Sequence, residues 1–430
     1  MPVLGDFSMI ERILDEVRIP KFAKARQNLP APVLDNVEEA VLTELNREKI
    51  KRLLTPGMKV AVAVGSRGIT NISKIVKTTI DFLKSRFIEP FIIPAMGSHG
   101  GATAEGQKQV LAEFGITEQT MGVPILSSME VEKIGEASGM PVYVDKYALT
   151  ADGVIIINRI KPHTAFRGVI ESGIIKMSVI GLGKQKGAES CHQLSMNRFD
   201  RHLIAMSKVV FEKVNVLFGL AILENAYDQT AEIYAIPVPE ILENEPRLLE
   251  KAKSLIPKIL LNPLDVLIVD EIGKDISGDG MDPNVTGRFS TKFAHGELEV
   301  ERIVVLGLTE KTEGNANGLG AADITTERVF NNFNMAKTYI NAITAAFPPT
   351  VRIPMVMRND NYAIRCAIKT SYCLQPERIR IVRIKNTLHV DEIYISEGLL
   401  PEAMANPQIE ILSKPEPFKF DRFGNLLTKI

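Results

Sequence analysis

Residues 58–65 read MKVAVAVG, a valine-rich apolar run that ends at a glycine, and this stretch decides the expected fold of the first half of the chain. A short apolar run bounded by turn residues is typical of a buried strand. Apolar residues at helical spacing follow over residues 72–87. The segment therefore predicts a strand, a loop that begins at Gly65-Ser66, and a helix.

The same unit recurs further along the chain. Residues 90–95 (PFIIPA) predict a second buried strand, residues 97–101 a glycine-rich loop, and residues 104–114 a helix that ends before Gly115. A third strand is predicted at residues 153–160 (GVIIINRI), and it stops at Lys161-Pro162 because proline disfavours helix and favours a turn. Strands that alternate with helices predict a parallel sheet covered by helices.

The second half repeats this alternation, so we predict an α/β protein with two domains and mainly parallel sheets. A helix is expected at 201–214, and residues 238–261 carry several prolines and acidic residues before the next strand at 264–269. Beyond it we expect, in chain order, the strand 302–308, the loop 313–321, the helix 323–332 and the strand 378–384. The predicted domains are residues 1–262 and 263–430, with the active site in the cleft between them and the second domain closing over it.

Composition narrows the class of partner to a small molecule. The 430 residues contain 51 lysines and arginines against 52 acidic residues, a net charge of -1 that indicates neither nucleic acid nor an anionic membrane as a partner. Residues 1–16 show no basic segment leading an apolar stretch, and the longest apolar runs are far shorter than the roughly 20 residues of a membrane span. Three cysteines without a CxxC motif fit a reducing cytoplasm, where we expect the protein.

Three of the six histidines fall in or beside glycine- or proline-containing loops, namely His99, His163 and His192. Ligands of parallel α/β sheets collect at the loops that follow the strands, and functional side chains concentrate on such loops. A single loop histidine is more often a hydrogen-bonded structural residue, but three in similar positions favour a shared site. The other three, His202, His295 and His389, are expected to be structural.

Residues 161–192 form the densest candidate segment. Within it, residues 181–187 (GLGKQKG) could approach a phosphate through glycine amides, but they match neither the P-loop nor the GxGxxG spacing, and a solvated basic turn is an equal alternative. Lys176 has apolar neighbours on both sides, and burial lowers the pKa of a lysine and frees its amine as a nucleophile. A lysine that extends to solvent from a helix rim is the competing interpretation.

Taken in order, Ser66-Arg67, Gly97-Ser98-His99, Lys161-Pro162-His163, Lys176 and His192 resemble the signature of the nickel-dependent lactate racemase superfamily. The resemblance implies a nickel-pincer nucleotide, that is, nickel held by a pyridinium-3,5-bisthiocarboxylic acid mononucleotide. It makes Lys176 the covalent attachment point through a thioamide, His192 a nickel ligand and Ser66 a cofactor-binding residue. Sulfur and nitrogen donors in a square plane suit nickel(II).

The resemblance also implies the reaction, which is racemisation or epimerisation of a small 2-hydroxy acid by hydride transfer to and from the cofactor. His99 and His163 would act as general acid and base on the hydroxyl, as imidazoles with pKa values near working pH can. Arg67 would bind the substrate carboxylate through its bidentate guanidinium. Enzymes of cofactor biosynthesis are the expected protein partners, and association into a homo-oligomer stays open.

Some residues depart from the family pattern or match it poorly. Lys274, in the loop 273–288 after a predicted strand, corresponds to a carboxylate-binding lysine of the family, although an ordinary Asp/Gly-rich turn explains the loop as well. Val64 stands where the family has an acidic residue, and the segment from His163 to Lys176 is longer. With Arg167 in that longer segment, these departures predict a substrate other than lactate, larger or more anionic.

Two other functions remain open from the sequence. His99, His163 and His192 could bind zinc with an open fourth position, as in a metallohydrolase. Such an enzyme has no use for a modified Lys176, which separates the two predictions. A non-catalytic nucleotide-binding protein is the third alternative, and exchange of His99 and His163 for alanine would leave its function intact.

Overall fold

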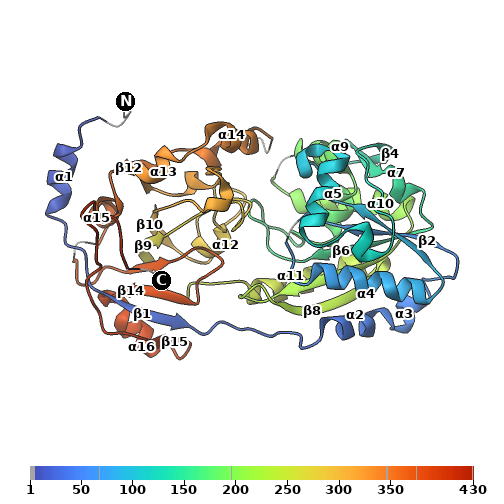
Figure 1. Cartoon of the computed structure of the whole chain (residues 1–430), viewed down its shortest axis with the longest axis horizontal. Helices are drawn as coiled ribbons and strands as arrows, with labels where there is room; N and C mark the ends of the chain where they lie inside the picture. Colours follow the sequence, from blue (N-terminus) through green and yellow to red (C-terminus); the bar gives the residue numbers. More distant parts are fainter. Residues whose placement is uncertain (1–4, 67, 195, 345–346, 374, 429) are drawn as a thin grey trace. The chain divides into compact units, whose positions relative to one another are not determined.

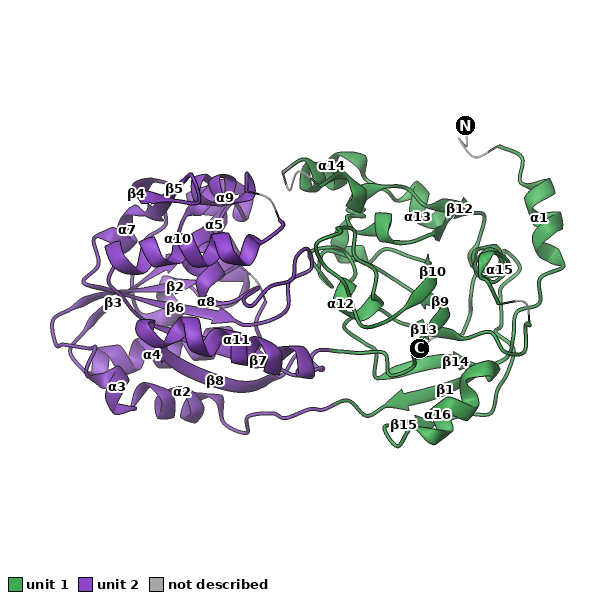
Figure 2. Ribbon diagram, turned by 180° about the vertical axis from the view of Figure 1, so that it is seen from behind, with its two compact units in different colours: residues 1–29, 257–430 green, residues 30–256 purple. Residues whose placement is uncertain are grey.

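The computed structural model describes residues 5–430 except residues 67, 195, 345–346, 374 and 429 (Figure 1). The chain forms two compact units (Figure 2). Residues 30–256 make up one of them, here named the middle unit. Residues 1–29 and 257–430 make up the other, the terminal unit. Each unit is an α/β structure with one mixed, mostly parallel sheet, which confirms the predicted fold class.

The middle unit is built on a five-stranded sheet in the order β3-β2-β6-β7-β8. Its strands are β2 (Lys59–Val64), β3 (Glu89–Pro94), β6 (Gly153–Arg159), β7 (Val216–Glu224) and β8 (Thr230–Pro237). Strands β3, β2, β6 and β7 are parallel, and β8 is antiparallel to β7. The three apolar runs that open the sequence analysis are thus neighbouring parallel strands.

Helices cover both faces of this sheet because alternate residues of each strand face opposite cores. Val60 and Val62 pack with the helices α2 (Val37–Leu45) and α4 (Ile72–Ser85). Ala61 and Ala63 face the other core, which contains α10 (Phe199–Lys213) and α11 (Val238–Leu255). Figure 1 shows α2 and α4 on one side of β2 and β6, with α10 on the other.

The remaining elements of the middle unit are short. In chain order they are α3 (Glu48–Lys51), η1 (Gly100–Ala102), α5 (Ala104–Glu113), α6 (Glu118–Met121), the hairpin β4 (Val131–Ala137) and β5 (Met140–Asp145), α7 (Lys146–Leu149), α8 (Ile174–Lys176), the π-helix η2 (Met177–Gly181) and α9 (Lys184–His192). The helix α5 begins where Thr103 caps it by accepting a hydrogen bond from Gly106 N.

The terminal unit contains an eight-stranded sheet in the order β12-β11-β10-β9-β13-β14-β1-β15. Its strands are β1 (Phe22–Gln27), β9 (Leu264–Val269), β10 (Val300–Val305), β11 (Ile324–Thr326), β12 (Met355–Met357), β13 (Ile381–Ile384), β14 (Glu392–Ser396) and β15 (Ile409–Ile411). The strands from β12 to β13 are parallel, and β14, β1 and β15 continue the sheet with antiparallel pairs.

The helices of the terminal unit flank this sheet. They are α1 (Ser8–Asp15), α12 (Pro283–Thr286), α13 (Glu327–Asn331), α14 (Met335–Thr344), α15 (Asp360–Thr370), α16 (Leu400–Ala405) and the 3₁₀ turns η3 (Glu310–Thr312), η4 (Leu319–Ala321), η5 (Pro348–Val351) and η6 (Glu397–Leu399). No helix in the described part of the chain combines the length and apolar character needed to cross a membrane.

The first 29 residues lie in a different unit from the one to which we assigned them. We placed residues 1–262 in one domain, but β1 pairs with β14, Phe22 opposite Ser396, and with β15 at the end of the chain. Pairing between segments so far apart in sequence leaves no local pattern to detect. The chain passes from the middle unit to the terminal unit at residues 256–257, close to the predicted boundary.

One segment has a different secondary structure from the expected one, and a second, for which we predicted no element, is helical. Residues 323–332 form β11 and then α13, not a single helix, because β-branched Ile324, Thr325 and Thr326 favour strand and the Thr326 side chain then caps the helix. The proline-containing stretch after residue 238 is the 18-residue helix α11. One proline occupies its first turn, where it is tolerated, and Pro246 lies inside it.

Candidate functional site

Three of the predicted loops meet at one edge of the middle sheet. Because β2, β3 and β6 are adjacent and parallel, the residues that follow Val64, Pro94 and Arg159 all lie at their carboxyl ends. A hydrogen bond joins Ser66 Oγ, after β2, to His99 Nδ1, after β3. The two loops that we predicted from separate motifs are therefore in direct contact.

The segment that carries Lys176 packs against this edge. Lys176 is the last residue of α8, and the π-helix η2 follows at once; π-helical turns occur frequently at functional sites. Gly97 N donates to Gly181 O (3.3 Å), which joins the His99 loop to the end of η2. A Cβ on Gly65 would lie 3.0 Å from Met177 Cε, so glycine after β2 leaves room for this packing.

Lys176 and His192 lie close enough for the ammonium to act on the imidazole. Burial of the imidazole and, second, the charge of Lys176 lower the pKa of His192 to about 4, although the residue as a whole is exposed. The same ammonium opposes the effect of burial on Cys191, whose thiol pKa is raised to about 12. His192 is consequently neutral near pH 7, the form in which imidazole binds a metal, and Cys191 is an unreactive buried thiol.

Aromatic rings connect His192 with His163. The His163 ring lies 4.5 Å from the Phe166 ring, Phe166 lies 5.0 Å from Phe199, and Phe199 lies 6.0 Å from His192, all measured between centroids. Phe166 and Phe199 are buried in the core that includes α10. Their fixed rings place both histidines beside one apolar wall.

The buried carboxylate of Glu171 holds the loop that carries His163. Its Oε2 accepts hydrogen bonds from His163 N (2.7 Å) and from the Arg167 guanidinium (3.2 Å), and its Oε1 lies 3.2 Å from Lys253 Nζ of α11. Backbone hydrogen bonds between Lys161 and Ser172 close the base of the loop. Arg167 also donates to His163 O (2.7 Å). Because this guanidinium is held inside the loop, it does not support our prediction of a more anionic substrate.

The loop of His99 is fixed by a second buried group. Gln107 Nε2 donates to Gly97 O (2.9 Å) and His99 O (3.2 Å), while its Oε1 accepts from Lys184 Nζ (3.0 Å). Lys184 is fully buried, forms an ion pair with Asp145 (3.2 Å) and donates to Pro94 O. Lys184 is therefore not part of a solvated basic turn, whereas Lys186 of the same GLGKQKG segment is exposed, and binding of a phosphate by its glycine amides stays a prediction.

The two predicted substrate-binding residues, Arg67 and Lys274, are not among the predicted residues that the structure brings together in the middle unit. Arg67 lies outside the described residues. Lys274 belongs to the terminal unit, where its Nζ donates to Gly278 O (2.6 Å) and its backbone N to Thr312 Oγ1 (3.1 Å). That the active site lies between the two domains stays a prediction.

The three histidines are not arranged as a zinc site. Within residues 5–430, leaving out the undescribed positions, no group of three His, Cys, Asp or Glu side chains is placed to hold a metal ion. The donor set that the metallohydrolase alternative requires is therefore not assembled there.

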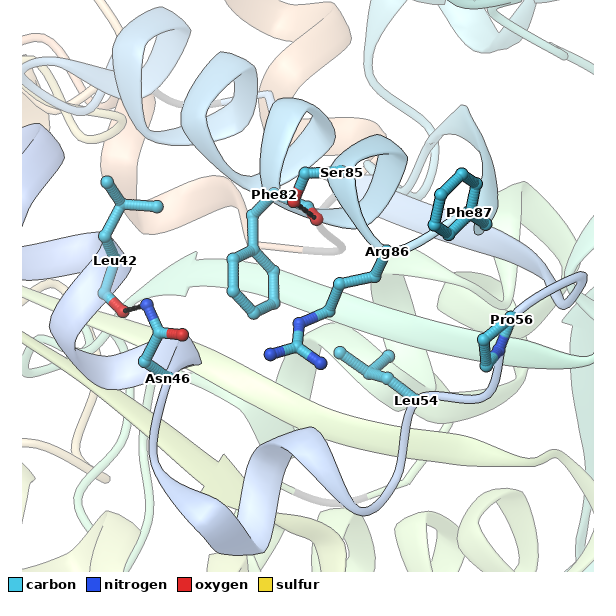
Figure 3. Close-up of a pocket in the computed structure, with 8 residues that line it drawn as sticks. All are labelled: Leu42, Asn46, Leu54, Pro56, Phe82, Ser85, Arg86 and Phe87. Atoms are coloured by element: carbon cyan, nitrogen blue, oxygen red, sulfur yellow. Dashed lines mark hydrogen bonds between the residues drawn. The ribbon is translucent and has the colours of Figure 1, made fainter.

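A hollow of about 610 Å³ lies elsewhere on the middle unit (Figure 3). Its lining comes from α2, the end of α4 and the loop before β2, and includes Leu42, Leu54, Phe82 and Arg86. Figure 3 shows the Arg86 guanidinium near the Phe82 ring, with which it makes a cation–π contact (5.0 Å). The hollow lies at the amino ends of β2 and β3, opposite the edge where the predicted residues meet.

Sequence reasoning missed the polar residues that hold the site. Glu171 and Glu245 are buried carboxylates, and Gln107 and Lys184 are a buried amide and ammonium. The only local signal was Glu171, a lone acid within the apolar run Val169 to Ile175. The other three stand on helices whose sequences look like ordinary solvent-facing surface.

Comparison with known proteins gives a family match and likenesses to solved structures. Residues 9–202 match the family model described as the lactate racemase N-terminal domain. Among solved structures, the lactate racemase apoprotein from Thermoanaerobacterium thermosaccharolyticum is 14% identical, covers 89% of this chain and 92% of its own, and has a TM-score of 0.47. No curated protein matches the chain.

Proposed function

We propose that the chain is a nickel-pincer-nucleotide-dependent racemase or epimerase of a small 2-hydroxy acid, a proposal supported by the match of residues 9–202 to the lactate racemase N-terminal domain model. The observation that carries the proposal is that Lys176 lies near enough to His192 for its charge to lower the pKa of the imidazole, in a segment packed against the carboxyl edge of a parallel sheet. Ser66, His99 and His163 stand on the loops of the same edge.

The residues present suit the cofactor. Lys176 is half-buried at the end of a short helix and would hold the cofactor through a thioamide. His192 is neutral and would offer a ring nitrogen to nickel, a soft to borderline metal that accepts imidazole. The chemistry that the cofactor supplies when bound is reversible acceptance of hydride from the carbinol carbon. Binding, orientation and proton movement are left to the side chains of this chain.

The two histidines have different hydrogen-bond surroundings, which divides their proposed roles. Ala165 N donates to His163 Nδ1 (3.0 Å), so the neutral His163 ring carries its proton on Nε2 and can donate to a substrate oxygen. His99 Nδ1 faces the Ser66 hydroxyl, which can accept or donate. His99 can therefore change tautomer and present an unprotonated Nε2, as a general base requires.

The carboxylate of the substrate would be bound by Arg67, and Lys274 is the second proposed carboxylate ligand. A guanidinium matches a carboxylate with two parallel hydrogen bonds. Arg167 is not among the proposed carboxylate ligands, since its guanidinium is engaged with Glu171 and His163 O.

The test is to load the protein and measure attachment, metal and turnover separately. The chain is co-expressed with the enzymes that make the cofactor, and intact mass and nickel content are determined on the same sample. We expect one cofactor mass and about one nickel per chain, both lost in Lys176→Ala and retained in Lys186→Ala, which changes an exposed lysine of α9. A hydroxy-acid library is then assayed by chiral chromatography.

Two results would contradict the proposal. An unmodified Lys176 in the presence of all cofactor enzymes and nickel would remove its basis. Loaded protein that inverts no member of the library would show that the bound cofactor serves another reaction.

A further inference from the structure

A second buried carboxylate, Glu245 of α11, lies against the short helix that carries Lys176. The residue is 1% exposed. Its Oε2 accepts a hydrogen bond from Ile175 N (3.0 Å), and the backbone N–H of Ile174 lies near enough to lower the pKa of the carboxyl. These are the first two residues of α8, so Glu245 faces N–H groups that the start of a helix leaves without intrahelical partners and satisfies that of Ile175.

The first turn of α8 is held on three sides. Gly173, directly before it, accepts a hydrogen bond at its carbonyl from Asn158 Nδ2 (2.9 Å) in β6. A Cβ on Gly219 of β7 would lie 2.8 Å from Ile174, so the missing side chain makes room for Ile174 on the sheet. A Cβ on Gly173 would lie 2.3 Å from Glu245 Oε1, which shows how closely the carboxylate approaches from α11.

This arrangement is costly for stability alone. Among the residues that the structure describes, no cation forms an ion pair with Glu245, and its Oε1 has no hydrogen-bond partner. Burial raises the pKa of this carboxyl to about 7, against the hydrogen bonds from the backbone, which lower it. An apolar side chain at this position would avoid the desolvation of a carboxylate. Residues that lower stability in this way, such as a buried carboxylate without a cation, concentrate at functional sites.

This contact bears on Lys176, which lies three residues after Gly173. Because Lys176 lies in the same helical turn as Ile174 and Ile175, the direction of its side chain depends on their placement and on that of Gly173 before them. We propose that Glu245 is a positioning residue whose carboxylate fixes this turn and so presents the Lys176 amine to the cofactor. The inference rests on the proposed function, in which Lys176 is the attachment point.

The contact can be disturbed from both partners. Glu245→Ala removes the acceptor, and Gly173→Ala forces the carboxylate away from the other side, at a backbone conformation that alanine adopts without strain (φ -176°). Glu245→Gln retains one acceptor oxygen in the same shape. Glu243→Gln is the matched control, because Glu243 lies on the same helix, pairs with Arg247 and is mostly exposed.

The readout is the fraction of chains with cofactor attached after a fixed co-expression time, by intact mass, with the melting temperature measured on the same samples. We expect attachment to fall about tenfold in Glu245→Ala and Gly173→Ala, because a small misplacement of a reacting group costs a large part of its rate. Glu245→Gln and Glu243→Gln should load like the wild type. Rescue by glutamine separates positioning from a general loss of folding.

The outcomes distinguish the inference from the function on which it rests. A wild type without attached cofactor would overturn the proposed function. A loaded wild type with equally loaded Glu245→Ala and Gly173→Ala would overturn the positioning role alone, and so would Glu245→Gln that loads as poorly as Glu245→Ala. If Glu245→Ala does not fold, Gly173→Ala and Glu245→Gln decide between these results.

Discussion

Replacement of Glu245 by glutamine should change how the stability of the middle unit depends on pH. Burial raises the pKa of Glu245 from an ordinary 4.5 to about 7 in the folded protein. Between these values the folded protein holds a proton that the unfolded chain has released, so the stability falls as pH rises and levels off above about 7. At about 1.4 kcal/mol per pKa unit, the loss is about 3 kcal/mol.

Glutamine cannot ionise, so Glu245→Gln should lack this loss. The free energy of unfolding of both proteins is measured by urea titration and far-UV circular dichroism between about pH 5 and about pH 8, and the variant minus wild-type difference is followed. Groups unaffected by the substitution cancel in that difference. We expect the variant to gain about 2–3 kcal/mol relative to the wild type across this range.

The control is Glu243→Gln on the same helix, where the side chain is mostly exposed and the difference should be flat with pH. A difference for Glu245→Gln that is equally flat would refute the reasoning, because it would mean that the carboxyl titrates alike in the folded and unfolded chain. A difference of opposite sign would mean that an unseen cation stabilises the ionised form.

Three further predictions concern the groups around the site. His163→Ala should lower kcat by about a hundredfold or more while cofactor attachment at Lys176 is unchanged, and loss of attachment would show that this loop supports the tether instead. Glu171→Gln weakens the anchor of His163 N, so kcat should fall about tenfold with little change in KM, whereas a change in KM alone would argue against a role in orientation. Lys184→Met leaves buried Asp145 without its cation and should cost about 3–5 kcal/mol in urea denaturation, and a cost below about 1 kcal/mol would contradict a structural ion pair.

The parallel strands and the loops after them followed from local pattern. The apolar runs at residues 58–64, 90–95 and 153–160 became β2, β3 and β6 within a residue or two at each end. An apolar run that ends at glycine or proline carries its own information, since both its burial and its end are decided by neighbours in sequence. The loops at Ser66, His99 and His163 were predictable for the same reason.

Contacts between distant segments were not predictable in this way. The pairing of β1 with β14 and β15 joins the two ends of the chain, and one strand does not specify its partner. The helix α11 contains an internal proline, which in isolation disfavours a helix, yet Ile241 and Leu249 bury one face of it in the core of the middle unit. Tertiary packing outweighed the local preference.

In the candidate site, too, some features followed from local sequence and others from contacts between distant segments. The sequence by itself determined which side chains we propose for the chemistry, because Lys176, His99, His163 and His192 stand in recognisable local motifs. Only the tertiary structure decided that Glu245 is buried against the helix of Lys176, and Lys184 beside the Gln107 side chain that holds the His99 loop. Whether a charged side chain is solvated or enclosed depends on what packs over it, and that information is spread over elements far apart in the chain.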